Sequence, residues 1–241
     1  MSRKIFLGLF WLVFVIYSVI SGASLSATMS ADLDLIVKLV VGEWSGINPL
    51  ITAIFYMMGI FPLLYGALIL FESAEQKISP YPFFFGSMGF GAFALLPYFA
   101  LRQHRDYRGG GNFALSRGQS NSAWNGQKNL WLKILDSRLM AIIASVAMMT
   151  FLVWGITQGN WSDFITQWQT SQFVHVMSLD FCVLCCLFIA ILDDDLERRS
   201  VTSKLLRKVA LIPLFGALVY WCLRPQLPET EADTSSQSIT S

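Results

Sequence analysis

Residues 139–157 read LMAIIASVAMMTFLVWGIT and contain no charged side chain. An α-helix rises about 1.5 Å per residue, so about 20 apolar residues are needed to cross the roughly 30 Å hydrocarbon core of a bilayer. This stretch is apolar on every face of a helix, which is typical of a buried or membrane-spanning helix and not of a surface helix of a soluble domain. It therefore predicts a transmembrane helix.

Five further apolar runs share this character. They are residues 5–23, 50–71, 82–101, 173–192 and the shorter 209–223. Over the whole chain 54% of the residues are apolar and only 14% are charged, against roughly 25% charged in a typical soluble domain. The sequence therefore predicts an all-α fold, a polytopic transmembrane helix bundle of about six spans in a single domain over residues 1–225.

The first run has a second interpretation. Arg3 and Lys4, the apolar stretch and the small residues that follow it also have the order of a secretory signal peptide. The run is longer than the usual apolar region of about 7–15 residues in such a peptide. A retained helix is therefore the preferred interpretation of residues 1–27, and a cleaved signal is the alternative.

Three other segments are predicted to lie outside the hydrocarbon. Residues 29–44 carry apolar residues at helical spacing, interrupted by acidic residues and Lys38, which predicts an amphipathic helix along the membrane interface. Residues 102–137 are basic and rich in Gly, Ser and Asn, which predicts a flexible loop. Residues 226–241 are polar with little to bury, which predicts a disordered tail. The chain shows no convincing internal repeat.

The Lys and Arg residues are distributed unevenly between the two sides of such a bundle. With six spans and an outer N-terminus, thirteen of the 17 lie on one side: Lys38, Arg102, Arg105, Arg108, Arg117, Lys128, Lys133, Arg138, Arg198, Arg199, Lys204, Arg207 and Lys208. Arg3, Lys4, Lys77 and Arg224 are left on the other side. Because cytoplasmic loops carry an excess of Lys and Arg, we expect the basic loop in the cytoplasm. The net charge of +1 argues against nucleic acid as a partner.

Asp180 is the most informative polar residue, because it lies inside the run 173–192. A carboxylate at such a position costs about 2.5–3.5 kcal/mol on insertion scales. It must therefore face other helices, be paired or carry a proton. The functional hypothesis is a proton relay, an ion site or a cofactor contact, and the structural alternative is a hydrogen-bond anchor between helices with Ser178 and His175 nearby. His175 could also ligate a metal or a pigment, although five residues along a helix place it on a different face from Asp180.

Two further clusters in the same region have a chemical and a structural interpretation. Cys182, Cys185 and Cys186 contain the spacing of a redox pair, but a thiolate is disfavoured in an apolar environment, so they are interpreted as small apolar residues. Asp193, Asp194 and Glu197 form a DDxxE pattern that resembles a magnesium-diphosphate site. The structural alternative is a solvated helix end, with Asp194 and Asp195 paired to Arg198 and Arg199 at i,i+4.

Small residues are concentrated in the run 82–101. Gly86, Ser87, Gly89 and Gly91 allow another helix backbone to approach closely. We therefore expect the runs 50–71 and 82–101 to form a tightly packed pair of antiparallel spans.

Two stretches resemble a known pattern. Residues 89–102 read GFGAFALLPYFALR, and residues 173–180 read FVHVMSLD before the acidic run. With the Asn48-Pro49 and Leu223-Arg224-Pro225 turns, they are similar to an uncharacterised multi-spanning membrane protein family of cyanobacteria and plastids. The resemblance covers roughly half of the chain. It implies a plasma or thylakoid membrane of a phototroph, with the basic loop on the cytoplasmic or stromal side, and it implies no reaction or cofactor.

The sequence contains no complete catalytic constellation. The leading expectation is a non-enzymatic integral membrane protein, an assembly, stabilising or pigment/lipid-associated factor, whose partners are membrane lipids and a larger membrane protein complex. One alternative is a small-solute or ion transporter that uses Asp180. The other alternative is a magnesium-dependent prenyl- or lipid-modifying enzyme that uses Asp193, Asp194 and Glu197.

Overall fold

The computed structural model describes residues 3–24, 29–70, 76–102, 134–135, 137–198 and 203–225. All secondary structure in these ranges is helical: α1 (Arg3–Ser24), α2 (Met29–Val41), α3 (Pro49–Ile69), α4 (Tyr81–Leu101), α7 (Arg138–Gln158), α8 (Trp161–Thr170), α9 (Gln172–Arg198), α10 (Lys204–Ala210) and α11 (Phe215–Leu223). The all-helical prediction is confirmed. The predicted tail and residues 103–133 of the predicted basic loop lie outside the described ranges.

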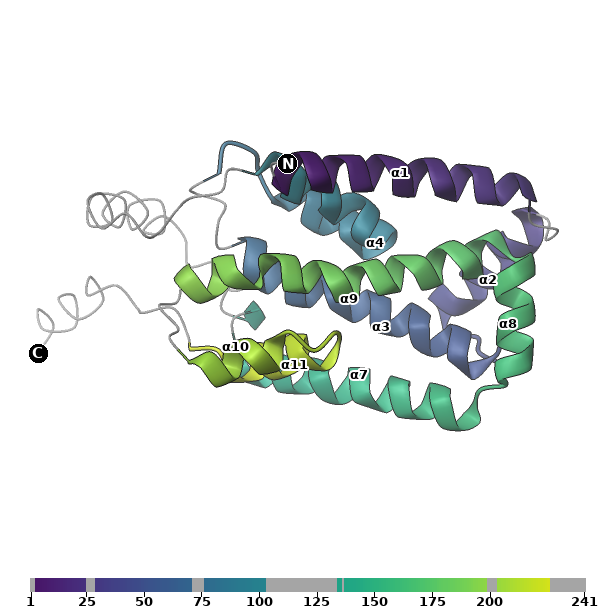
Figure 1. Cartoon of the computed structure of the whole chain (residues 1–241). Helices are drawn as coiled ribbons and strands as arrows, with labels where there is room; N and C mark the ends of the chain where they lie inside the picture. The colour runs from purple at the N-terminus through teal and green to yellow at the C-terminus, as the bar shows by residue number, and fades with distance from the viewer. Residues whose placement is uncertain are drawn as a thin grey trace, which may run out of the picture.

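Five of these helices are long and apolar enough to cross a membrane: α1, α3, α4, α7 and α9. Figure 1 shows α3 and α9 at the centre, with α1 and α7 on the outside. In the most apolar windows of α3 and α9, 61% and 50% of the residues are buried, against 17% and 22% in α1 and α7. Such a bundle is compatible with a multi-pass membrane protein whose outer helices face lipid.

The fourth helix turns back on itself at Gly91. This residue has φ 48° and ψ −125° inside α4, a conformation that is open to glycine and strained for other residues. The rings of Phe83 and Tyr98 lie 5.5 Å apart, whereas in a continuous helix these positions are about 22 Å apart. A Cβ placed on Gly86 would lie 3.2 Å from the Cβ of Ala94. The two halves of α4 are therefore antiparallel, and we name α4 the first hairpin.

The neighbours of α4 show the same reversal. Phe84 lies against Gly66 of α3, and Phe99 lies 6.1 Å from the ring of Tyr65 on the same helix. Residues from both halves thus meet adjacent residues of α3. The run 82–101 was predicted as one span, and its length and composition agree with that prediction, but its backbone enters and leaves at the same end of the bundle.

The run 209–223, predicted as the sixth span, is not a single helix. α10 and α11 are joined by a tight turn over 211–214, in which Leu214 has a positive φ of 63°. A Cβ on Gly216 of α11 would lie 2.7 Å from Ala210 of α10, so the two helices pack side by side. We name α10–α11 the second hairpin. The prediction of six spans is not confirmed, because a chain of this length cannot turn back and also cross.

The two hairpins reveal an internal repeat that sequence inspection missed. A long helix, a short helix, a second long helix and a hairpin occur in that order in α1–α4 and again in α7–α11. The hairpins end on related residues, Tyr98-Phe-Ala-Leu-Arg102 and Tyr220-Trp-Cys-Leu-Arg224. Both hairpins enter from the same end of the bundle, where Arg102 and Arg224 lie (Figure 1). We call this the basic end.

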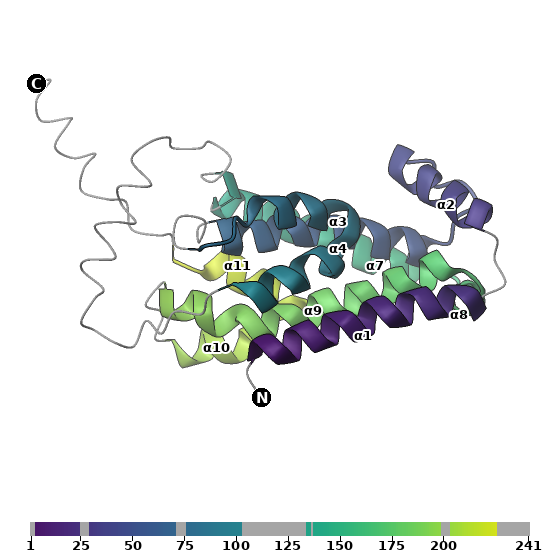
Figure 2. The same ribbon diagram turned by 90° about the horizontal axis from the view of Figure 1, so that it is seen from above.

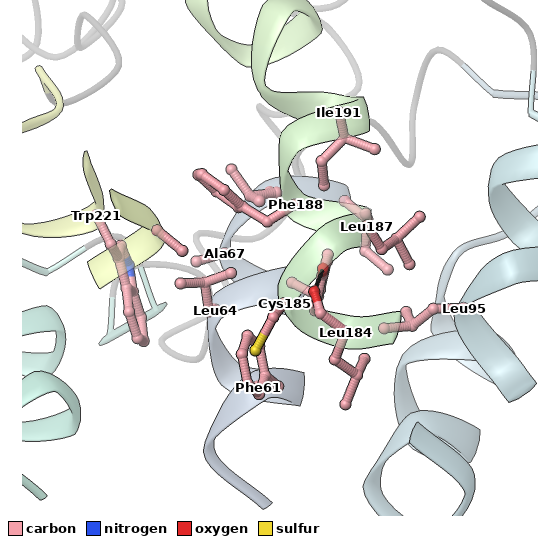
Figure 3. Close-up of a cluster of buried hydrophobic side chains, with 14 of the residues drawn as sticks. Phe61, Leu64, Ala67, Leu95, Leu184, Cys185, Leu187, Phe188, Ile191 and Trp221 are labelled. Carbon is pink, nitrogen blue, oxygen red and sulfur yellow. Dashed lines mark hydrogen bonds between the residues drawn. The ribbon is translucent and has the colours of Figure 1, made fainter. Parts of the chain in front are cut away.

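The main apolar core lies where α3, α9 and the two hairpins meet. Figure 3 shows Leu184 and Leu187 of α9 beside Leu95 of the first hairpin, and Trp221 of the second hairpin beside Leu64 of α3. All of these side chains are buried. The core therefore fixes both hairpins against the central pair of helices.

The short helices α2 and α8 lie at the opposite end of the bundle (Figures 1 and 2). The predicted amphipathic helix over residues 29–44 is present as α2, and Leu33 and Val37 on it are exposed. Asp32 of α2 accepts hydrogen bonds from the Ser171 hydroxyl (2.6 Å) and the Phe173 N–H (3.1 Å) at the start of α9. Residues of the first run form α1, which packs along the first hairpin, with Trp11 Nε1 donating to the Phe93 carbonyl at 2.9 Å.

Candidate functional site

Asp180 lies on α9 and is only 2% exposed. At about 1.5 Å per residue it is roughly 12 Å from the start of α9. Its Oδ1 accepts a hydrogen bond of 2.9 Å from the backbone N–H of Ala92. Its Oδ2 has no hydrogen-bond partner among the described residues. The candidate site is therefore a buried carboxyl with one bonded and one unbonded oxygen.

The backbone partner of Asp180 is the start of a half-helix. Ala92 is the first residue after the reversal at Gly91, so its N–H is one of those that a helix leaves without an internal partner. These N–H groups and the helix dipole favour a negative group at this point. The Asp180 carboxyl thus caps the second half of the first hairpin from another helix.

Gly91 is required by both the backbone and the carboxyl. A Cβ at this position would collide with Oδ2 of Asp180 and lie 2.8 Å from its Cγ. Among the predicted packing residues, Gly86 faces the other half of its own hairpin, and the Ser87 hydroxyl donates to the Phe84 carbonyl at 2.7 Å. A Cβ on Gly89 would meet nothing within 4 Å. Of these small residues, Gly86 thus makes its close approach within α4, and Gly91 makes one to Asp180 of α9.

We expect Gly91→Ala to lower the free energy of unfolding by about 1–3 kcal/mol, because it combines a strained φ with the contact to Asp180. Gly89→Ala, two residues earlier, adds a methyl group in open space and should change stability by less than about 0.5 kcal/mol. Unfolding of both variants in detergent measures the difference. Equal stabilities would contradict the reversal at Gly91.

The base of the first hairpin is held by a second carboxylate of α9. Asp194 forms ion pairs with Arg102, at the end of the hairpin, and with Arg3 of α1, at 3.1 Å. The side chains of Arg102 and Asp194 are 7% and 9% exposed. Asp180 and Asp194 are 14 residues apart on α9, which places them about 40° apart around the helix. α9 therefore holds the half-helix at its start and at its end.

The neighbouring aspartates bind the second hairpin. Oδ2 of Asp195 accepts a hydrogen bond of 2.7 Å from Tyr220 and lies 3.7 Å from Arg224. Asp193 pairs with Arg207 of α10 at 2.8 Å. Each aspartate of the acidic run thus has a basic partner on another helix. The structure does not describe the side chains of Glu197 and Arg198, and no group of three metal-ligating side chains is found among the residues that it does describe.

These ion pairs correct the predicted distribution of charge. Arg3 and Arg224 were expected on the side opposite to the basic loop, yet both bind the acidic run beside Arg102. Lys77 precedes the first hairpin, whose two ends lie together, so it belongs to the same end. The prediction was wrong because it treats the two hairpins as spans, and each span counted in error reverses the side assigned to the rest of the chain.

The structure does not bring together the side chains of His175, Ser178 and Asp180, which lie close in the sequence. His175 shares a hydrogen bond of 2.7 Å between Nε2 and the Tyr17 hydroxyl, and its Nδ1 lies 3.0 Å from the Trp168 carbonyl. A metal or pigment at His175 would have to displace one of these partners. Ser178 donates to the carbonyl of Val174 on its own helix at 2.7 Å. Asp180 alone faces the first hairpin.

Sequence reasoning missed Arg102 and Arg224 as partners of the acidic run. The signal that could have identified them is the repeated Tyr-aromatic-x-Leu-Arg pattern at the ends of two apolar runs.

The three cysteines of α9 differ in exposure. Cys185 is buried, while Cys182 and Cys186 are exposed, and all three lie within the candidate span.

Comparisons with protein-family models, curated proteins and solved structures find no match to this chain.

Proposed function

We propose that the chain is a multi-pass membrane protein that moves protons across its membrane, with Asp180 as the group that binds the proton. The observation that carries the proposal is the unbonded Oδ2 of Asp180 at the tip of the first hairpin. A carboxyl that served only to join two helices would be expected to use both of its oxygens. Ionisable residues inside membrane helices mark proton and ion pathways in many pumps and transporters.

The surroundings of the carboxyl favour a proton over a metal ion. A hard cation needs several oxygen ligands, and no oxygen of another residue is hydrogen-bonded to Oδ2 of Asp180 among the described residues. A proton needs only the one oxygen. The buried hydroxyl of Tyr65 donates to the Leu184 carbonyl at 2.6 Å and is therefore occupied.

The broken helix supplies an element that can move. Irregular backbone at membrane depth occurs where it is buried in protein or lines a pathway, and transporters place substrate sites at the ends of such half-helices. Protonation removes the charge with which Asp180 holds the start of the half-helix. In this proposal the tip of the first hairpin then shifts and opens Asp180 to one side of the membrane.

The basic end is proposed to face the cytoplasm or, in a thylakoid membrane, the stroma. Arg3, Arg102, Arg138 and Arg224 lie at this end, whereas Lys38 on α2 lies at the other. The proposed orientation follows the excess of Lys and Arg in cytoplasmic loops. It also places the basic end against the anionic lipid head groups of the inner leaflet.

Proton uptake into liposomes tests the proposal. Purified protein is reconstituted with a pH-sensitive dye inside, and a potassium diffusion potential drives protons inward. The wild type should acidify the interior, and Asp180→Asn should fall to the level of protein-free liposomes. Ser178→Ala, two residues away with a hydroxyl bonded to its own helix, should keep wild-type rates. Equal rates for wild type and Asp180→Asn would overturn the proposal.

A further inference from the structure

The second hairpin covers only part of α7. α11 lies beside the first half of α7, where Ser145 Oγ and Cys222 Sγ are 3.4 Å apart. The hairpin turns back at 211–214, and Figure 1 shows α7 continuing well beyond its tip. Val153, about two turns further along α7 than Ser145, is 53% exposed. A hairpin that enters from one end thus leaves the other half of its outer neighbour uncovered.

A groove of about 590 Å³ runs along α7 from Ser145 to Trp154. It is lined by Ser145, Val146, Met149, Thr150, Val153 and Trp154. The Thr150 hydroxyl donates to the Val146 carbonyl at 2.8 Å, so it offers little polarity to a ligand. The groove is therefore a surface for an apolar chain and not for a polar solute.

Aromatic side chains close the groove at the end that carries α2 and α8. Trp154 of the groove lies 5.8 Å from the ring of Trp44. Trp44 donates from Nε1 to the Tyr56 hydroxyl at 3.1 Å, and Tyr56 stacks on Phe151 at 5.1 Å. Trp and Tyr are enriched at the level of the lipid head groups. The groove thus begins near the end of the bundle that carries α2 and α8 and ends at Ser145, which lies beside Cys222 of α11.

We infer that this groove binds one acyl chain of a lipid from the leaflet at the α2/α8 end. From Ser145 to Trp154 the helix rises about 14 Å, which is close to half of a hydrocarbon core of roughly 30 Å. The second hairpin lies against α7 toward the basic end and so keeps lipid of that leaflet away from the groove. If the groove stayed empty, the side chains that line it would lose van der Waals contacts. The inference rests on the proposed membrane location and not on proton movement.

A spin-labelled lipid tests the inference. Wild-type protein is reconstituted with phosphatidylcholine that carries a nitroxide midway along one chain, and electron paramagnetic resonance measures the motionally restricted fraction. Met149→Trp and Val153→Trp fill the groove and should each remove a restricted component present in the wild type. Ile143→Trp, on the same helix outside the groove lining and 55% exposed, should retain it.

The outcomes separate the possible occupants. Loss of the component in both groove variants, with retention in Ile143→Trp, supports a bound acyl chain. A restricted fraction that is the same in all four proteins overturns the inference. A second copy of the chain in the groove is shown instead if the wild type is dimeric in detergent and Met149→Trp is monomeric, which also overturns it. Proton uptake by the groove variants is measured in parallel, so failure of this inference is distinguishable from failure of the proposed function.

Discussion

Asp194→Leu is expected to lower the free energy of unfolding by about 3–5 kcal/mol, because it removes a carboxylate that pairs with a buried guanidinium. Arg102 is 7% exposed and pairs with Asp194 at the base of the first hairpin. Arg3 loses the same partner but is more exposed, with 37% of its side chain accessible. Unfolding of wild type and variant by denaturant in detergent micelles measures the difference.

The matched controls use the same acidic run. Asp193→Asn removes an exposed pair with Arg207 and should cost less than about 1 kcal/mol. Arg102→Met combined with Asp194→Leu replaces the buried pair by apolar side chains and should recover most of the loss. A loss for Asp194→Leu no greater than that for Asp193→Asn would show that the base of the hairpin is not held in this way.

Asp180→Ala is expected to speed hydrogen exchange at the Ala92 amide by about ten- to a hundredfold. The carboxyl accepts the hydrogen bond of this N–H, and a buried donor without its partner loses about 1–3 kcal/mol, where each 1.4 kcal/mol is a factor of ten. Exchange followed by mass spectrometry on peptides that contain residues 91–93 measures the effect.

Asp180→Asn is the informative comparison for this measurement. Its amide oxygen can still accept from the Ala92 N–H, so exchange should stay within a few-fold of wild type although proton uptake is lost. If Asp180→Ala exchanges at the wild-type rate, the half-helix does not depend on Asp180, and the carboxyl is not the cap of the hairpin.

Hydropathy and helix length predicted most of the helices. The runs 5–23, 50–71, 139–157 and 173–192 correspond to α1, α3, α7 and α9. A long apolar run in a membrane forms a helix because a helix satisfies all of its backbone hydrogen bonds internally. The reversal in α4 escaped prediction because its two halves are as apolar as a span. Its signals were Gly91 and the neighbouring small residues, which the sequence alone assigns equally well to packing between two helices.

The candidate site was predictable in part. Asp180 stood out because a carboxylate in an apolar helix is costly wherever it lies. The partner of Asp180 could not be predicted, because it is the backbone N–H of Ala92, and every residue type except proline has a backbone N–H. The roles of Arg102 and Arg224 depend on where the hairpins end, so they could be assigned only after the two reversals were known. The resemblance to a cyanobacterial and plastid family stays a prediction.

The sidedness of three engineered cysteines tests most directly whether the first hairpin turns back. Lys77→Cys, Ser203→Cys and Ser162→Cys are each labelled in intact cells with a membrane-impermeant maleimide, and then again after the membrane is opened. Lys77 precedes the first hairpin, Ser203 precedes the second, and Ser162 lies on α8 at the other end of the bundle. We expect Lys77→Cys and Ser203→Cys to react from the same side and Ser162→Cys from the opposite side. Reaction of Lys77→Cys and Ser162→Cys from one side, with Ser203→Cys on the other, would mean that residues 81–101 cross the membrane and would contradict the account.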